Sequence, residues 1–157
     1  MSLARDLILT AKAKGIMIAS AESCTGGMVA AALTDVAGSS AVLDRGFVTY
    51  TNAAKSELLG VQTETLDAHG AVSEDVAFEM AKGALKNSSA HIAVSITGIA
   101  GPGGSEFKPE GRVCFGVSFK STTHTETIEF GALGRKYIRE SAKNHALTLL
   151  LECVLEY

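Results

Sequence analysis

Residues 16–28, Ile16-Met17-Ile18-Ala19-Ser20-Ala21-Glu22-Ser23-Cys24-Thr25-Gly26-Gly27-Met28, decide the fold of this chain. The short apolar run Ile16–Ser20 predicts a buried strand. After the two glycines, Met28–Val36 predicts a helix. A strand that passes directly into a helix is typical of α/β proteins, in which successive strands lie parallel and the helices cross over between them.

The rest of the chain repeats this alternation on both sides of the opening stretch. The polar segment Ser121–Thr125 lies between two strand-like runs, which predicts a hairpin and an antiparallel end to the sheet. We therefore expect an α/β fold with a mixed five-stranded sheet, helices on both faces and an antiparallel C-terminal hairpin. The expected elements are helix 3–14, strand 16–20, helix 28–36, strand 46–51, helix 53–59 capped by Asn52, a helical turn from Thr63 or Thr65, helix 73–86 capped by Ser73, strands 91–96, 113–119 and 126–130, and helix 135–155, whose buried face carries Ile138, Ala142, His145, Leu149 and Cys153 or Val154.

The composition is typical of a globular protein and indicates a single domain over residues 1–157. The hydrophobic fraction is 46%, the charged fraction 20% and the net charge -3, so no bulk charge favours nucleic-acid binding. The three cysteines are dispersed, which disfavours a disulfide framework and indicates a reducing compartment, the cytoplasm. The N-terminal stretch does not resemble a signal peptide, and no apolar run is long enough to span a bilayer.

The first glycine cluster follows the first strand and suggests a ligand site. In open α/β sheets ligands bind outside the carboxyl ends of the strands, where a helix N-terminus offers unpaired N–H groups. Ser23, Cys24 and Thr25 supply nucleophile-capable side chains, and Gly26 and Gly27 allow a ligand to approach closely. The alternative is that Ser23 or Thr25 only caps the helix. The stretch matches neither a Walker loop nor the G-x-S-x-G elbow of common hydrolases.

The second glycine cluster, Thr97–Ser105, also follows an expected strand. Backbone N–H groups around Gly98 and Gly101 could form an anion-binding nest next to Thr97, although a plain flexible connection fits equally well. Because both clusters follow strands that we expect to be neighbours, we hypothesise one shared site.

The charged residues are not informative by themselves. Lys55, and Arg135 with Arg139 on one face of the last helix, each also fit a solvated surface. Glu22 fits a partly buried acid that holds a neighbouring loop better than it fits a catalytic base. The four histidines lack metal-ligand spacing, so no metal site is expected.

The ordered motifs of this chain resemble the C-terminal domain of the competence-damage-inducible protein CinA, a family of bacterial nicotinamide mononucleotide deamidases. The resemblance begins at Ala21–Gly27 and covers nearly the whole chain. The other matching stretches are Ala37–Ser40, Arg45–Lys55, Leu59–Val61, His69–Glu74, Thr97–Gly104, Lys108–Gly111 and Gly134–Arg139.

This resemblance implies a three-layer α/β/α domain that hydrolyses the carboxamide of nicotinamide mononucleotide to nicotinate mononucleotide and ammonia, with no metal or cofactor. It also implies association into a homo-oligomer. Where the family usually has Gly-Asp-Arg, Gly134 directly precedes Arg135 here, so either terminal arginine fits the family's position. The family's serine, tyrosine, lysine and pre-loop hydroxyl residue fall on Ser23, Tyr50, Lys55 and Thr97, and its arginine falls on Arg139 or Arg135.

A mechanism follows as a hypothesis. Ser23 attacks the carboxamide carbon, a neutral Lys55 takes its proton, and Tyr50 relays a proton or protonates the leaving ammonia. Backbone N–H groups of residues 23–26 or near Gly98 hold the oxyanion, and Arg139 or Arg135 grips the phosphate together with the glycine loop. Two alternatives stay open: Cys24 is the nucleophile, or the chain is a non-catalytic nucleotide-binding module linked to competence or DNA damage.

Overall fold

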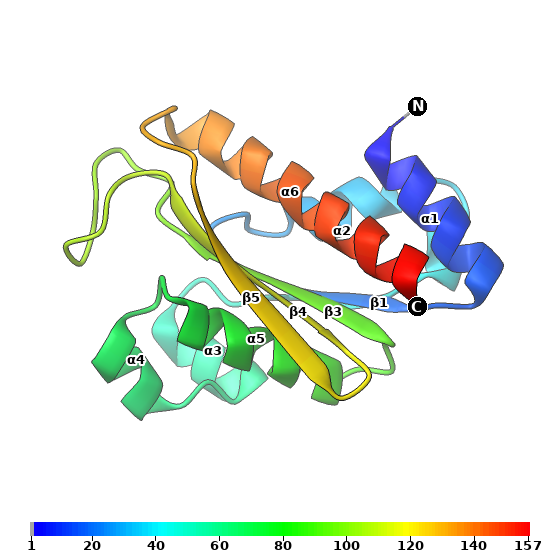
Figure 1. Cartoon of the computed structure of the whole chain (residues 1–157), viewed down its shortest axis with the longest axis horizontal. Helices are drawn as coiled ribbons and strands as arrows, with labels where there is room; N and C mark the ends of the chain where they lie inside the picture. Colours follow the sequence, from blue (N-terminus) through cyan, green and yellow to red (C-terminus); the bar gives the residue numbers. More distant parts are fainter. Residues whose placement is uncertain (1) are drawn as a thin grey trace.

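The structure, a computed structural model, describes residues 2–157 and consists of one mixed sheet between two layers of helices (Figure 1). This is the expected three-layer α/β/α arrangement. One face of the sheet is covered by α1 (Leu3–Lys14), α2 (Met28–Thr34) and α6 (Arg135–Glu156). On the other face lie α3 (Asn52–Leu59), α4 (Thr63–His69) and α5 (Glu74–Lys86).

The sheet has five strands in the order β2-β1-β3-β4-β5. Strand β1 (Ile18–Glu22) lies parallel to both β2 (Leu43–Val48) and β3 (Ile92–Gly98). Strand β4 (Arg112–Phe119) is antiparallel to β3 and to β5 (Thr122–Glu129). The mixed sheet and its antiparallel C-terminal hairpin are therefore confirmed, and the carboxyl ends of β1, β2 and β3 meet at one edge.

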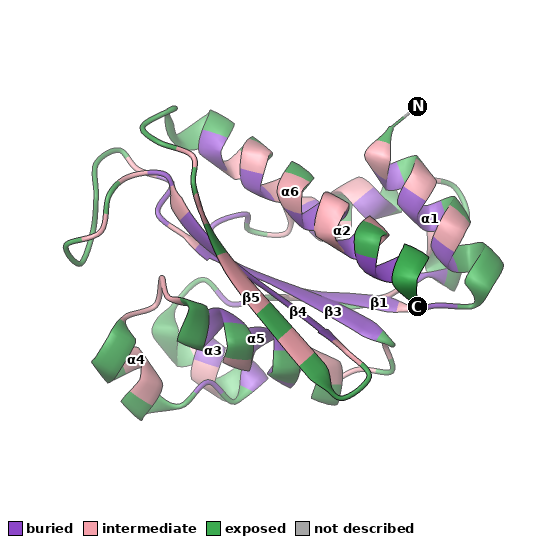
Figure 2. Cartoon of the chain, in the orientation of Figure 1, coloured by how far each residue is buried: buried purple, intermediate pink, exposed green. Residues whose placement is uncertain are grey.

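Burial explains why these segments form the centre of the molecule. All five residues of β1 are buried, and Figure 2 shows the central strands buried between the helices. The larger core cluster joins the sheet to α1, α2 and α6, and a smaller one joins it to α3 and α5. Lys55 is the exception, since it is charged by type and yet one of the largest fully buried side chains. A buried lysine is rare unless it has partners, which makes this side chain a feature of the site.

The first two strands differ in position from the sequence-based expectation. Strand β1 begins at Ile18 rather than Ile16, and β2 covers Leu43–Val48 rather than Gly46–Thr51. The parallel register explains the shift of β2, because Ile18 pairs with Leu43. Thr51 lies outside the strand and instead caps α3, where its side chain accepts a hydrogen bond from Ala54 N. The assignment of that cap to Asn52 was therefore wrong.

The C-terminal hairpin is tighter than expected. Strand β5 begins at Thr122, so most of Ser121–Thr125 is strand and not loop. Thr122 pairs with Phe119, and Thr123 shares a hydrogen bond with Ser118. Polar residues are tolerated here because β5 is an edge strand that is only partly covered.

The helices differ from expectation in smaller ways. Helix α2 ends at Thr34 instead of Val36, and a short 3₁₀ helix (Ser39–Ala41) follows it. Helix α6 buries Ala146 and Leu150 in place of His145 and Leu149, which are only partly covered. The N-cap of α5 at Ser73 is confirmed. Among residues 2–157, no helix combines the length and apolar character that crossing a membrane would require.

Candidate active site

Ser23 is the first residue after β1 and is buried next to the neighbouring strand. Its N–H donates to Ile96 O of β3 at 3.0 Å, so the backbone stays attached to the sheet one residue beyond the strand. The side chain is 8% exposed. Ser23 therefore lies at the carboxyl edge of the parallel strands, where ligands of open α/β sheets bind.

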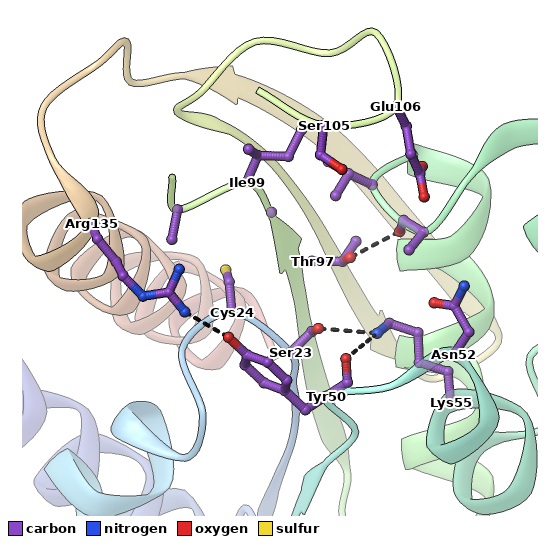
Figure 3. Close-up of a pocket in the computed structure, with 14 residues that line it drawn as sticks. Ser23, Cys24, Tyr50, Asn52, Lys55, Thr97, Ile99, Ser105, Glu106 and Arg135 are labelled. Carbon is purple, nitrogen blue, oxygen red and sulfur yellow. Dashed lines mark hydrogen bonds between the residues drawn. The ribbon is translucent and has the colours of Figure 1, made fainter. Parts of the chain in front are cut away.

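Lys55 reaches Ser23 from the first turns of α3 (Figure 3). Its Nζ donates to Ser23 Oγ at 3.0 Å, to Thr49 O at 3.0 Å and to Tyr50 O at 3.4 Å. Burial lowers the pKa of Lys55, while the nearby Cys24 and Glu106 oppose that shift. A neutral amine has two N–H groups and one lone pair. The two carbonyls can accept the N–H groups, which leaves the lone pair for the Ser23 hydroxyl.

Glu22 occupies the N-terminus of α2. Its carboxylate is 1% exposed and accepts hydrogen bonds from two hydroxyls and three backbone N–H groups. The donors are Ser20 Oγ, Thr25 Oγ1, Gly27 N, Val29 N and Ala30 N. Glu22 thus holds the neighbouring loop, as expected, although it is fully rather than partly buried.

This arrangement corrects the expectation of free N–H groups for a ligand at the start of α2. The positive end of the helix is already neutralised by the protein's own carboxylate. Thr25, Gly26 and Gly27 are not among the residues that line the cavity described below. Their observed contacts instead fix the loop that carries Ser23.

A cavity of about 210 Å³ opens above Ser23 and Lys55. Its walls come from the ends of β1 and β3, the β2–α3 connection, the α4–α5 connection, the glycine-rich loop and the start of α6. The segments after β1 and β3 therefore meet at one site, because these strands are neighbours, but only Ser23 and Cys24 of the first cluster line it. The lining residues are Ser23, Cys24, Tyr50, Asn52, Lys55, Ala71, Val72, Thr97, Gly98, Ile99, Ala100, Ser105, Glu106 and Arg135.

The two terminal arginines occupy different places. Arg135 lines the cavity, and its guanidinium donates to Gly101 O and to Tyr50 Oη, each at 2.7 Å. Arg139 does not line it; its Nε donates to Cys24 O at 2.9 Å and its Nη2 to Thr25 O at 3.3 Å. Arg135 is therefore available to a ligand, whereas Arg139 braces the loop behind Ser23.

Tyr50 and Thr97 reach the cavity with their polar groups already engaged. The Tyr50 hydroxyl accepts from Arg135, and its backbone carbonyl, not its hydroxyl, contacts Lys55. The Thr97 hydroxyl donates to Ala71 O at 2.8 Å. Gly98 lines the cavity, and Gly101 contributes its carbonyl to Arg135.

Cys24 lines the cavity but is a poor candidate for the nucleophile. Burial raises the pKa of its thiol to about 11, and the reactive form of a cysteine is the thiolate. The neighbouring Ser23 hydroxyl has Lys55 Nζ within hydrogen-bond reach, which Cys24 does not.

Sequence reasoning found the centre of the site but missed part of its wall. Ser23, Tyr50, Lys55, Thr97, Gly98 and Arg135 come together. The sequence does not single out Asn52, Ser105 or Glu106: Asn52 fits a helix cap, and Glu106 lies in a loop whose most prominent feature is its glycines. Within residues 2–157, no cluster of three or more His, Cys, Asp or Glu side chains is arranged to hold a metal ion.

Comparison with known proteins relates the whole chain to a family. The chain is 48% identical over 157 residues to the nicotinamide-nucleotide amidohydrolase PncC of Escherichia coli K12, which covers 99% of this chain and 95% of that protein. It is 55% identical over 121 residues to a CinA-like protein of Chlorobium phaeobacteroides, of which it covers 29%.

Solved structures agree with the fold. The competence/damage inducible protein CihA of Agrobacterium tumefaciens is 50% identical, with a TM-score of 0.92 over 96% of this chain and 92% of that one. A CinA superfamily protein of Klebsiella pneumoniae gives a TM-score of 0.94 at 36% identity, covering 99% and 97%. The family model described as the CinA C-terminal domain matches residues 1–154, and the chain therefore belongs to the CinA C-terminal domain family.

Proposed function

We propose that this protein is a nicotinamide-nucleotide amidase, and that residues 1–157 act as one domain that hydrolyses nicotinamide mononucleotide to nicotinate mononucleotide and ammonia. The observation that carries the proposal is the buried contact between Lys55 Nζ and Ser23 Oγ at 3.0 Å. A serine needs an adjacent base to become a nucleophile, and a lysine whose pKa is lowered by burial supplies one. The relatives named as nicotinamide-nucleotide amidohydrolases supply the substrate.

In the proposed reaction, Ser23 Oγ bonds to the carboxamide carbon as Lys55 takes its proton. The C–N bond then breaks, the proton passes to the nitrogen, and ammonia leaves an acyl ester on Ser23. A water molecule, deprotonated by Lys55, attacks that ester and releases the carboxylate product together with the Ser23 hydroxyl. No step needs a metal or a redox partner.

One backbone N–H group beside Ser23 is proposed as a donor to the oxyanion. Ser23 N and Gly26 N already donate to Ile96 O and Ser23 O, and Thr25 does not line the cavity, which leaves Cys24 N from this segment. Removal of one oxyanion donor typically costs about 2.7–4 kcal/mol of activation free energy. Tyr50 accepts from Arg135 and keeps its own O–H free, so we assign it a proton relay: its O–H proton goes to the leaving nitrogen and the proton held by Lys55 replaces it, which restores both groups.

The phosphate is assigned to Arg135 and the adjacent glycine loop. Arg135 lines the cavity from the start of α6 and can form charge-assisted hydrogen bonds with phosphate oxygens. Arg139 is assigned a positioning role, because its guanidinium already donates to two carbonyls of the Ser23 loop.

The test is ammonia release from nicotinamide mononucleotide by the purified protein, measured with and without a chelator. Release that is unaffected by the chelator and absent in Ser23→Ala supports a metal-independent serine amidase. Binding of the mononucleotide without any release would instead favour the non-catalytic nucleotide-binding module. Association into a homo-oligomer stays a prediction, which light scattering coupled to size-exclusion chromatography checks.

A further inference from the structure

The rim of the cavity carries opposite charges on its two sides. Three residues of the lining are charged by type, namely Lys55, Glu106 and Arg135. Lys55 lies buried at the base, next to Ser23. Figure 3 shows Arg135 and Glu106 on opposite sides of the cavity with Ser23 between them. Within residues 2–157, Glu106 is the one carboxylate that lines this cavity.

The local backbone holds Glu106 in this position. Ser105 N donates to Lys108 O at 3.0 Å and Lys108 N to Ser105 O at 2.8 Å, which closes a tight turn. Glu106 and Phe107 form its tip with positive φ values of 51° and 64°. Residues other than glycine rarely adopt this conformation, but a two-residue hairpin turn requires it at both central positions.

The turn is also tied to the adjacent wall of the cavity. Lys108 Nζ donates to His69 O at the end of α4 and to Val72 O in the α4–α5 connection, each at 2.6 Å. Gly70 lies directly against the Glu106 carboxylate, and a Cβ at this position would overlap it. The glycine therefore leaves the space that the carboxylate occupies. The influence of Glu106 on the pKa of Lys55 agrees with a carboxylate that faces the interior of the cavity.

We infer that Glu106 is a specificity-determining residue whose carboxylate pairs with the positively charged pyridinium ring of the substrate, while Arg135 holds the phosphate at the other side. This inference rests on the proposed function, because the substrate named there is a zwitterion with a cationic ring and an anionic phosphate. The charges of the rim match the charges of that molecule. An amide with an uncharged ring gains nothing from Glu106.

The experiment measures binding in a Ser23→Ala background, in which no turnover occurs, by titration calorimetry at low ionic strength. The two probes are nicotinamide mononucleotide and its reduced form, which has the same ribose and phosphate but an uncharged dihydropyridine ring. Glu106→Gln removes the charge and keeps the size of the side chain. The matched control is Glu57→Gln, which makes the same charge change on an exposed position of α3 outside the cavity.

Glu106→Gln is expected to weaken binding of the oxidised mononucleotide by about threefold to fivefold, the range of an exposed charge pair. Binding of the reduced form should stay within error, and Glu57→Gln should change neither. Equal loss for both probes, or no loss for either, overturns the role of Glu106.

The proposed function is checked separately by ammonia release from the unmodified protein. If the unmodified protein releases ammonia, but Glu106→Gln binds the oxidised form in preference to the reduced form as strongly as before, the inference is overturned and the amidase proposal stands. Failure to bind or hydrolyse the mononucleotide at all overturns both.

Discussion

Lys55 Nζ and Ser23 Oγ lie 3.0 Å apart in the interior of the protein, although 32 residues separate them in the chain. Ser23 is held by its N–H bond to Ile96 O, and Lys55 by the first turns of α3. Each side chain is fixed by a different element, so the contact depends on the pairing of β1 with its two parallel neighbours.

Ser23→Ala should abolish ammonia release and preserve binding of the mononucleotide, because it removes the nucleophile and little volume. Cys24→Ala should retain most of the activity, since the raised pKa keeps the Cys24 side chain as an unreactive thiol. Both variants are compared by ammonia release and by calorimetry. Activity in Ser23→Ala, or its loss in Cys24→Ala with the fold intact, would transfer the nucleophile assignment to the thiol.

The pH dependence should report Lys55. The amine is a base only when neutral, so kcat/KM should rise with pH through the pKa of Lys55, which burial places below the ordinary value for lysine. Below that pKa the ammonium has no lone pair and activity is lost. The negative charge of Glu106 raises the pKa of Lys55, so Glu106→Gln should move the ascending limb of the pH–rate profile to lower pH.

Lys55→Arg tests the same assignment with a side chain that cannot become neutral. An arginine stays protonated at every accessible pH, so it cannot act as the base. We expect a loss of about 10²- to 10⁴-fold in kcat, the usual contribution of a general base. A folded Lys55→Arg variant with normal activity, or a rate that does not vary with pH, would rule out Lys55 as the base.

Arg135 and Arg139 should separate in their effects. In the Ser23→Ala background, Arg135→Gln should weaken mononucleotide binding roughly tenfold through lost charge-assisted hydrogen bonds. It should leave binding of nicotinamide riboside, which lacks the phosphate, unchanged. Arg139→Gln should lower kcat and thermal stability together, because Cys24 O and Thr25 O lose their donor. The reverse pattern would assign the phosphate to Arg139.

Glu22→Gln should destabilise the fold by about 3 kcal/mol, because an amide cannot accept all five hydrogen bonds that the buried carboxylate accepts. Urea unfolding measures the change. Glu57→Gln is the control and should stay within about 0.5 kcal/mol, since Glu57 is exposed. A Glu22→Gln variant as stable as the parent would mean that the start of α2 does not depend on this carboxylate.

Gly83→Ala should also destabilise the fold, although alanine is usually preferred to glycine inside a helix. Gly83 lies inside α5, and a Cβ there would overlap Leu59 O at the end of α3. The strain should outweigh the gain in helix propensity and cost about 3 kcal/mol. Lys82→Ala, on the exposed side of the same helix, serves as the control in the same unfolding measurement.

The sequence by itself determined the order and type of the elements. Apolar runs such as Ile92–Ile96 are short and continuous because the central strands are buried on both faces, and this pattern is local. The strand boundaries are harder to predict from the sequence, since β2 takes its position from its register with β1. The threonines of β5 looked like a loop because an edge strand needs no apolar alternation on its exposed side.

The site divides in the same way. Ser23, Lys55 and the two glycine clusters could be identified from local motifs and from the resemblance to a family. Only the tertiary structure decided that Glu22 fills the start of α2, that Arg135 rather than Arg139 lines the cavity, and that Glu106 faces Arg135 across it. The physical reason is that the hydrogen bonds from the start of α2 to a carboxylate at the end of β1, burial and opposing charges all depend on contacts between elements. A sequence records which side chains are present, but strand pairing and helix packing decide which of them meet.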